Sequence, residues 1–151
     1  MDFPFGFGLS YTNFTYGSMS LSSTTIKACD DLLLQVYVTN SGDRDGEEVV
    51  QVYLKQPRAS VPVPNVRLAD FERVFIPKGE TVRVDLLIRP ETHYVVYGNS
   101  TDIYHPVLYV ESGPLELFVG GGQPGHFKGG LDATVNVSNS KNYEDCPKYK
   151  Y

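Results

Sequence analysis

Histidines and a glycine-rich run are the first places in this sequence to look for chemistry. His93, His105 and His126 are widely separated, and no two of them have the spacing of paired metal ligands on one helix or strand. The run from Gly120 to Gly125 matches G-x-G-x-x-G, but a dinucleotide site needs a helix directly after that turn, and Pro124 argues against one. We therefore interpret them as ordinary loop residues and expect neither a cofactor nor a metal ion.

Carboxylates are the second candidates, because glycoside hydrolysis needs two of them about 5 to 10 Å apart in a sugar-sized cleft. Four lie in expected strands or turns: Asp70, Glu72, Glu80 and Asp85. Strand alternation places such side chains on a solvated face, and nothing in the sequence singles out a pair. The acidic run 43–48 resembles a calcium loop, but the carboxylate needed at its end falls in an apolar strand near Val52. The sequence therefore predicts no catalytic residue in this chain.

The elements that would position any site are strands, because apolar and polar residues alternate along most of the chain. The alternation is clearest over 32–39, 50–55 and 81–88. Further strands are expected at 14–21, 68–76, 94–97, 107–110, 115–119 and 133–137. The turn formers at 40–46 make either a β-hairpin or a connection between two sheets. Seven or eight strands drawn from these nine candidate ranges, with turn signals between them, predict an all-β fold, an antiparallel immunoglobulin- or fibronectin III-like sandwich.

We expect this sandwich to cover residues 13–137. Residues 138–151 are polar and rich in Lys, Asn and Tyr, so they are expected to form a tail unless Cys146 anchors them.

The net charge of −5, from 18 acidic and 13 basic residues, disfavours nucleic acid as a partner. No run of 18 apolar residues is present, so we expect no membrane-spanning segment.

Sequons and cysteines point to the secretory pathway. Three N-x-S/T triplets begin at Asn13, Asn99 and Asn136, and they are glycosylation candidates. The two cysteines, Cys29 and Cys146, are expected to form one disulfide if the protein is secreted, and the alternative is two free buried thiols. Because the first residues lack the pattern of a signal peptide, we expect the chain to be the downstream part of a longer secreted precursor.

Five motifs follow one another in a recognisable order. They are P-F-G-F-G-L-S-Y-T at 4–12, V-T-N-S-G at 38–42, G-E-E-V-V-Q-V-Y at 46–53, L-x-x-F-E-R-V at 68–74 and P-x-G-E-T at 77–81. Over residues 3 to 122 the chain resembles the C-terminal fibronectin type III-like domain of family-3 glycoside hydrolases, the group of β-glucosidases and β-xylosidases. In that family a Gly usually stands where this chain has Asp70, and a position that needed positive φ would strain an Asp.

The resemblance implies that the catalytic carboxylates lie in domains that precede this one. The chain would then be a non-catalytic accessory module whose partners are the catalytic domains of a β-xyloside or β-glucoside hydrolase. Residues 1–12 would be the junction from those domains. An apolar strip there would contact them, since apolar groups at that density are costly to leave in water; it comprises Phe3, Phe5, Phe7, Leu9 and Tyr11.

Two alternatives remain open at this point. One is a free-standing extracellular module that binds polysaccharide through tyrosines stacking on sugar rings. Its candidates are Tyr94, Tyr97, Tyr104 and Tyr109. The other is a matrix or protein-interaction domain that uses the same exposed apolar start.

Overall fold

The protein is built almost entirely from strands. The computed structural model describes residues 8–99 and 102–147. The strands are β1 (Phe14–Leu21), β2 (Thr25–Ile26), β3 (Leu32–Asn40), β4 (Gly46–Lys55), β5 (Arg67–Ile76), β6 (Thr81–Ile88), β7 (Val95–Asn99), β8 (Asp102–Val110), β9 (Gly113–Gly120), β10 (Leu131–Val137) and β11 (Lys141–Asn142). Two short 3₁₀ helices, η1 (Pro90–Thr92) and η2 (Tyr143–Asp145), complete the elements, and the described residues contain no α-helix.

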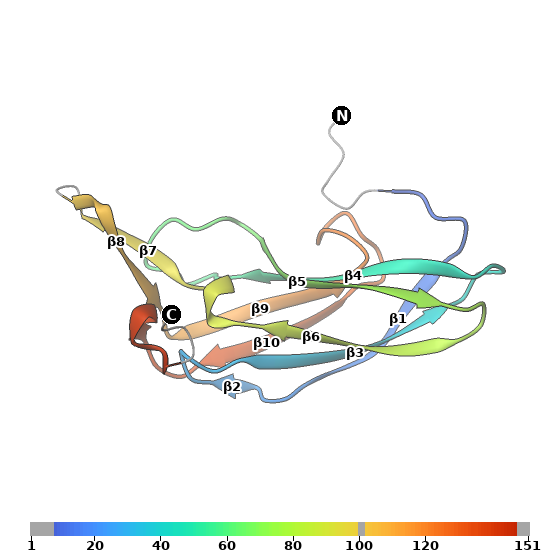
Figure 1. Ribbon diagram of the computed structural model, residues 1–151, viewed down its shortest axis with the longest axis horizontal. Helices are drawn as coiled ribbons and strands as arrows, with labels where there is room; N and C mark the ends of the chain where they lie inside the picture. The colour runs from blue at the N-terminus through green and yellow to red at the C-terminus, as the bar shows by residue number, and fades with distance from the viewer. Residues whose placement is uncertain (1–7, 100–101, 148–151) are drawn as a thin grey trace.

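The strands form two stacked sheets and a projecting hairpin. One sheet has the order β1-β3-β6 and the other β2-β10-β9-β4-β5. A third, small sheet of order β11-β8-β7 carries the hairpin that extends from one end of the molecule (Figure 1). The expected sandwich is therefore confirmed, but the expected count of seven or eight strands is too low. β2 and β11 have only two residues each, too few to show any period, and β2 pairs in parallel with β10.

Alternating side chains supply the core between the two sheets. β3 buries Leu34 and Val36, and these residues pair with Leu86 and Val84 of β6. β4 belongs to the opposite sheet, and its inward side chains, among them Val52, are buried against those of β3 and β6. Each such side chain contributes about 1.5–3 kcal/mol when it leaves water, so the inward faces of these strands supply much of the stability.

The segment 40–46 connects the two sheets. β3 pairs with β1 and β6, whereas β4 pairs with β5 and β9. Of the two interpretations of this turn, the inter-sheet connection is therefore the one that the structure has. The clear alternation on both sides did not distinguish them, because consecutive strands bury one face in either case.

The C-terminal segment is anchored as far as residue 147. Cys29 and Cys146 form a disulfide with a Cα–Cα distance of 5.4 Å and a sequence separation of 117. Asn142 of β11 lies beside Tyr109 of β8, and its Oδ1 accepts from the Glu144 N–H at 3.0 Å. Cys146 thus anchors the segment after residue 137, which is not a free tail as far as residue 147.

Asp70 lies at an irregularity between β4 and β5 and links the two sheets at their open edges. The register between these strands shifts where Val52 pairs with Asp70 and Tyr53 with Leu68. The Asp70 Oδ2 accepts from the Leu87 N–H of β6 at 2.7 Å. The expected strain at this position is absent, because only glycines among the described residues have positive φ. The carboxylate instead satisfies a backbone donor on an edge strand, which would otherwise lack a ladder partner.

Candidate functional site

The end of the junction segment is fastened to the turn between the sheets. Thr12 is buried, and its Oγ1 donates to Asn40 Oδ1 at 2.7 Å. The Asn40 Nδ2 donates to the carbonyl oxygens of Arg44 at 2.7 Å and Ile76 at 2.9 Å. Asn40 is itself fully buried, so its amide holds together three segments that are far apart in sequence.

Two glycines in this turn make room for Thr12. A Cβ at Gly42 would lie 2.1 Å from the Thr12 Oγ1 and 2.7 Å from the Asn13 backbone nitrogen. A Cβ at Gly46 would lie 2.7 Å from the Thr12 Cγ2. The motifs at 4–12, 38–42 and 46–53 therefore meet in space, since the threonine of the first sits against glycines of the other two.

Two hollows flank the start of the described chain. One has a volume of about 470 Å³ and is lined by Leu9, Val49 and Phe71, among others. The other, of about 460 Å³, lies toward the 121–130 loop and is lined by more polar groups, among them Asn13 and His126. Both include Leu9, whose side chain is 95% exposed.

Glu48 lines both hollows, together with Gly8, Leu9 and Ser10 of the junction segment. Its Oε1 accepts from the Tyr16 hydroxyl at 3.1 Å. Burial raises the pKa of Glu48, and the hydrogen bond from Tyr16 partly opposes that rise. Burial also raises the pKa of Tyr16, with the negative charge of Glu48 as the next cause. Glu48 forms no ion pair with any of the described residues.

The glycine-rich run after β9 packs tightly and forms one wall of these hollows. A Cβ at Gly120 would lie 2.7 Å from the Phe127 ring, and one at Gly121 would lie 2.2 Å from the Glu48 Oε1. Phe127 also packs edge-to-face on Tyr16, with ring centroids 5.4 Å apart. Glycine is required here because an aromatic ring and a carboxylate approach the backbone, which is a packing role and not a phosphate site.

An apolar surface continues from the hollows along β4 and β5. Antiparallel pairing places Val49 opposite Arg73, Gln51 opposite Phe71 and Glu47 opposite Phe75, so these side chains share the outer face of the sheet. Phe71 and Phe75 are 58% and 59% exposed. We call the exposed apolar side chains of this region the junction face, which consists of Leu9, Val49, Leu68, Phe71 and Phe75.

The sequence-based list of contact residues and the junction face overlap only in part. Leu9 and Tyr11 have exposed side chains, while Phe3, Phe5 and Phe7 lie outside the described residues. Phe71 and Phe75 were missed. The available signal was that β5 is apolar on both faces, with Ile76 inward and these rings outward, at the edge of a sheet.

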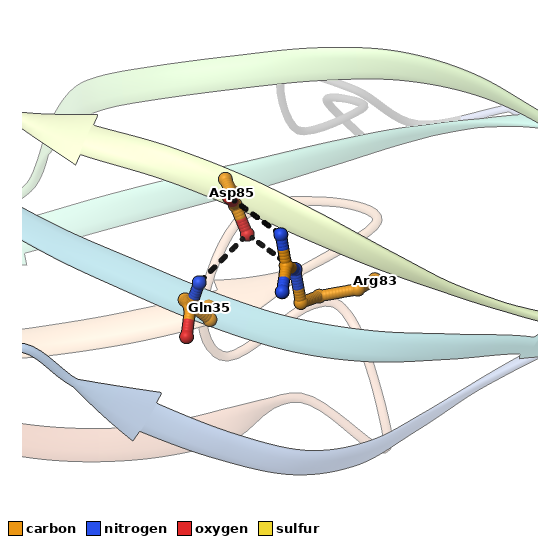
Figure 2. A network of polar contacts seen from close by, with 3 residues as sticks. All are labelled: Gln35, Arg83 and Asp85. Atoms are coloured by element: carbon orange, nitrogen blue, oxygen red, sulfur yellow. Dashed lines mark hydrogen bonds and ion pairs between the residues drawn. The ribbon is translucent and has the colours of Figure 1, made fainter.

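The carboxylates considered for glycoside hydrolysis do not come together at either hollow. Asp85 lies on the outer face of the β1-β3-β6 sheet, where it accepts from Gln35 Nε2 at 3.2 Å and pairs with Arg83 at 3.0 Å (Figure 2). Asp70 lies between the edges of β5 and β6. None of Asp70, Glu72, Glu80 and Asp85 lines either hollow.

The two histidines with described side chains, His93 and His126, do not form a common site. His93 is fully buried, and its ring nitrogens have no hydrogen-bond partner among the described residues. Burial lowers the pKa of His93 to about 4, and the nearby Arg67 guanidinium adds to that effect. His126 lines the more polar hollow, and the side chain of His105 lies outside the described residues. Within residues 8–99 and 102–147, no three His, Cys, Asp or Glu side chains are grouped as a metal site would need.

The described tyrosines among those considered for sugar stacking, Tyr94, Tyr97 and Tyr109, do not line one face together. Tyr94 packs against Tyr143 with ring centroids 5.4 Å apart and is partly covered by the core. Tyr97 and Tyr109 pack edge-to-face on the β7–β8 hairpin at 5.8 Å. The side chain of Tyr104 lies outside the described residues.

The sequons differ in their surroundings. Asn13 and Asn136 have exposed side chains, and the side chain of Asn99 lies outside the described residues. Asn13 lines the more polar hollow, while Asn136 lies on β10 between β2 and β9. In the part of the chain that the structure describes, no helix has the length and hydropathy to cross a membrane.

Comparison with known proteins places this arrangement in a family. The chain is 47% identical to a β-glucosidase of Rhizobium radiobacter over 88 residues, which are 58% of this chain and 11% of that enzyme. It is 46% identical to a β-xylosidase of Formosa agariphila over 54% of this chain and 11% of that enzyme. The chain thus spans about one ninth of the curated relatives that it matches.

Among solved structures, β-glucosidase 3B of Thermotoga neapolitana in complex with α-D-glucose superposes with a TM-score of 0.77 at 30% identity. The match covers 92% of this chain and 17% of that one. The model of the fibronectin type III-like domain matches residues 48–123, from Glu48 on β4 through β9 to Gln123. The chain therefore belongs to the fibronectin type III-like domain family.

Proposed function

We propose that this chain is a non-catalytic accessory domain of a secreted glycoside hydrolase that acts on β-linked glucosides or xylosides. Its role is to pack on the catalytic domains and stabilise them. The observation that carries the proposal is the junction face, where Leu9, Phe71 and Phe75 leave apolar surface in water beside the segment that leads into the sandwich. Exposed apolar surface of this kind marks a contact with another protein surface.

The relatives support the same role. Each named enzyme contains a region similar to this chain as a small part of its length, 11% in the β-glucosidase and in the β-xylosidase. The four carboxylates considered for glycoside hydrolysis line neither hollow, and of the two that do, Glu47 is paired with Arg73 and Glu48 accepts from Tyr16, which agrees with catalytic groups supplied by another domain.

Two assays test the proposal. The isolated chain is expected to release no product from aryl β-glucosides or aryl β-xylosides, and robust turnover would contradict the non-catalytic role. Removing the matched region from the Rhizobium radiobacter β-glucosidase is expected to shorten the half-life of its activity on heating. Covalent replacement with this chain should restore most of that half-life; a hybrid no more stable than the truncated enzyme would argue against the accessory role.

Secretion and glycosylation are part of the same proposal. The disulfide between Cys29 and Cys146 favours an oxidising compartment. Asn136 is exposed on the body of the sandwich, whereas a glycan on Asn13 would fill the hollow beside the junction. Expression in a secretory host, followed by enzymatic deglycosylation and mass measurement, is expected to show a glycan at Asn136 and none at Asn13.

A free-standing binding module is the second candidate, and one observation favours it. On the projecting β7–β8 hairpin, Val96, Tyr97 and Val107 are 49%, 37% and 45% exposed. An amphipathic aromatic ring at such a position can stack on a sugar. Retention of the chain on insoluble xylan or cellulose, lost with Tyr97→Ala, would support this candidate, and no retention on either polymer would remove it.

A further inference from the structure

The more polar of the two hollows is built by segments that meet at one end of the sandwich. Asn13 and Phe14 lie where β1 begins, and Glu48 lies on β4 of the opposite sheet. The glycine-rich loop after β9 forms a further wall with Gln123, His126, Phe127 and Lys128. The volume of about 460 Å³ lies within the usual range of about 300–1,000 Å³ for small-molecule sites. Loops at the end of a sandwich are well placed to bind, because the two sheets hold them in fixed positions.

Several polar side chains in this hollow have unused hydrogen-bonding capacity. Within residues 8–99 and 102–147, the side chains of Asn13, Gln123 and His126 form no hydrogen bond. The Glu48 Oε1 accepts from the Tyr16 hydroxyl at 3.1 Å, whereas no donor among the same residues reaches Oε2. Such groups in a concave site can orient a ligand, since each can bond to it without first giving up a partner within the protein.

The backbone and rings around these side chains are held in place by contacts within the domain. The Gln123 carbonyl oxygen accepts from the His126 N–H at 3.2 Å and from the Phe127 N–H at 3.0 Å, so this part of the loop is a closed turn. The Phe127 ring packs edge-to-face on Tyr16, which also holds the Glu48 carboxylate. A site whose walls are in place before binding loses less conformational entropy when a ligand arrives.

The charges and rings of the hollow indicate the chemistry of its ligand. One carboxylate, Glu48, and one ammonium group, Lys128, oppose each other in sign, so a neutral ligand suits the hollow better than an anion or a cation. The amide and imidazole groups both donate and accept, as vicinal hydroxyl groups do. Phe14 and Phe127 add apolar ring surface, on which the C–H face of a sugar can pack. These properties together match a pyranose, a neutral ring that carries several hydroxyl groups.

We propose that the more polar hollow binds one pyranose unit of a mono- or oligosaccharide. The free oxygen of the Glu48 carboxylate accepts from ring hydroxyls, and a hydrogen bond to a charged acceptor is the strongest of the set. Gln123 and His126 bond to hydroxyls from the loop side, and Asn13 does so from the β1 side. The sugar ring rests against Phe127. Binding here is a property of the sandwich itself, so it goes beyond packing on another domain and does not depend on it.

Heteronuclear NMR of the isotope-labelled chain, titrated with D-glucose and with D-xylose, tests the proposal. The amide signals of Gly121, Gln123 and His126 are expected to shift, whereas those of β7 and β8 are expected to stay in place. A dissociation constant of about 1–10 mM is expected, because a ring of about twelve non-hydrogen atoms reaches that range at ordinary ligand efficiency. Cellobiose and xylobiose distinguish the sources of such a ring. Tighter binding of these disaccharides indicates the end of a polysaccharide, and equal binding indicates a free monosaccharide.

Two further ligands test the chemistry of the site. A phosphorylated glucose is expected to bind no more tightly than glucose, because the Glu48 carboxylate opposes the attraction of the Lys128 ammonium group for phosphate. Sorbitol carries a similar set of hydroxyl groups on a flexible open chain. It is expected to bind at least about fivefold more weakly, since it must be ordered on binding and has no ring to pack on the aromatic wall.

Substitutions of single groups locate the site. Gln123→Ala combined with His126→Ala is expected to weaken glucose binding by more than about tenfold, because both side chains lose their bonds to the ring. Asn13→Ala is expected to weaken it by about three- to fivefold. Asn136→Ala, which removes an exposed Asn on β10, is the matched control and should change it by less than about twofold. The urea midpoints of these variants should stay close to the native value, since none of the hollow side chains replaced bonds within the described protein.

Three results would overturn the inference. No amide shift with any of the sugars at about 100 mM, about ten times the weakest expected dissociation constant, would show that the hollow does not bind them. Tighter binding of the phosphorylated glucose than of glucose would mark an anion site instead. Shifts confined to β7 and β8 and lost with Tyr97→Ala would place the binding on the hairpin. Each of these results leaves the proposed accessory role intact, because the heat stability of the truncated and hybrid enzymes tests that role separately.

Discussion

The Thr12 hydroxyl donates to the Asn40 side-chain oxygen at 2.7 Å, across 28 positions of sequence, and both residues are buried. The Gly42 N–H donates to the same oxygen at 3.2 Å. One amide group thus fastens the chain to the turn between the sheets just before it enters the sandwich, beside the Ser41 contacts to the Asn13 carbonyl. The position of Leu9 relative to the two sheets depends on this fastening.

Removing this hydrogen bond is expected to destabilise the domain. Thr12→Val keeps the shape of the side chain and should cost about 1–2 kcal/mol, while Asn40→Ala should cost about 3 kcal/mol, because it leaves several buried partners unsatisfied. Urea denaturation of the isolated chain measures both. Ser41→Ala is the control, because the Ser41 hydroxyl donates to the Asn13 carbonyl at an exposed position. A Thr12→Val variant as stable as Ser41→Ala would contradict the assigned role.

The disulfide is expected to contribute strongly to stability. It closes a loop with a separation of 117 residues, so Cys29→Ala with Cys146→Ala should lower the free energy of unfolding by about 3–5 kcal/mol. Limited proteolysis of the double variant should cut first in the 138–147 segment, since short elements and a few contacts, such as the Tyr94–Tyr143 packing, would then hold it without a covalent link. Equal denaturation midpoints for the native and double-variant proteins would refute this expectation.

The tight contact at Gly121 is expected to reject a methyl group. In Gly121→Ala the new Cβ displaces the Glu48 carboxylate and presses on Phe127, which should cost about 1–3 kcal/mol. Gly17→Ala, in β1, is the matched control, because its Cβ would approach the Tyr37 carbonyl oxygen no closer than 3.5 Å. Thermal melting compares the two. A smaller loss for Gly121→Ala than for Gly17→Ala would show that the 121–130 loop gives way without cost.

His93 is expected to make the domain less stable in acid. Its pKa lies near 4 when folded and near 6.5 when unfolded, so between these values the unfolded chain binds more protons. The stability that His93 confers is therefore complete above about pH 6.5, falls with decreasing pH and is lost near pH 4. The total amounts to about 3 kcal/mol.

The measurement for His93 is urea unfolding as a function of pH. His93→Phe removes the titrating group and should flatten this part of the profile. The raised pKa of Glu48 acts in the opposite direction, because it favours the folded state as the pH falls. The difference between the two profiles therefore isolates His93. Parallel profiles for the two proteins would contradict the assignment.

Much of the fold could be predicted from the sequence, because most strands bury one face. β3 and β6 show the reason, since their inward residues pair in register and their outward residues are polar or partly exposed. β2 and β11 could not be predicted, because a two-residue strand has no period and exists only through its partner. The turn at 40–46 was ambiguous for a similar reason: which sheet β4 joins depends on its pairing with β5 and β9.

The candidate site could be predicted only on its N-terminal side. Leu9 and Tyr11 stood out because apolar residues repeat in a short segment, whereas Phe71 and Phe75 were hidden in a strand that also contributes to the core. Glu48 gave no signal, because it lies in a motif where acidic residues suit a turn as well as a site. The residues that could not be predicted join the site only through tertiary packing, which brings β4, the junction and the glycine-rich loop to one place.

The disulfide also determines how the domain would respond to a pulling force. Tension applied between the junction and residue 147 passes along the chain only as far as Cys29 and then crosses to Cys146. The covalent path bypasses the residues between these cysteines, so tension can lengthen the chain only by pulling β1 and β2 away from β3 and β10, with which they pair. The maximum extension is then about 70 Å, far less than the full chain would give. A domain tethered at both ends would thus act as a short, stiff mechanical link.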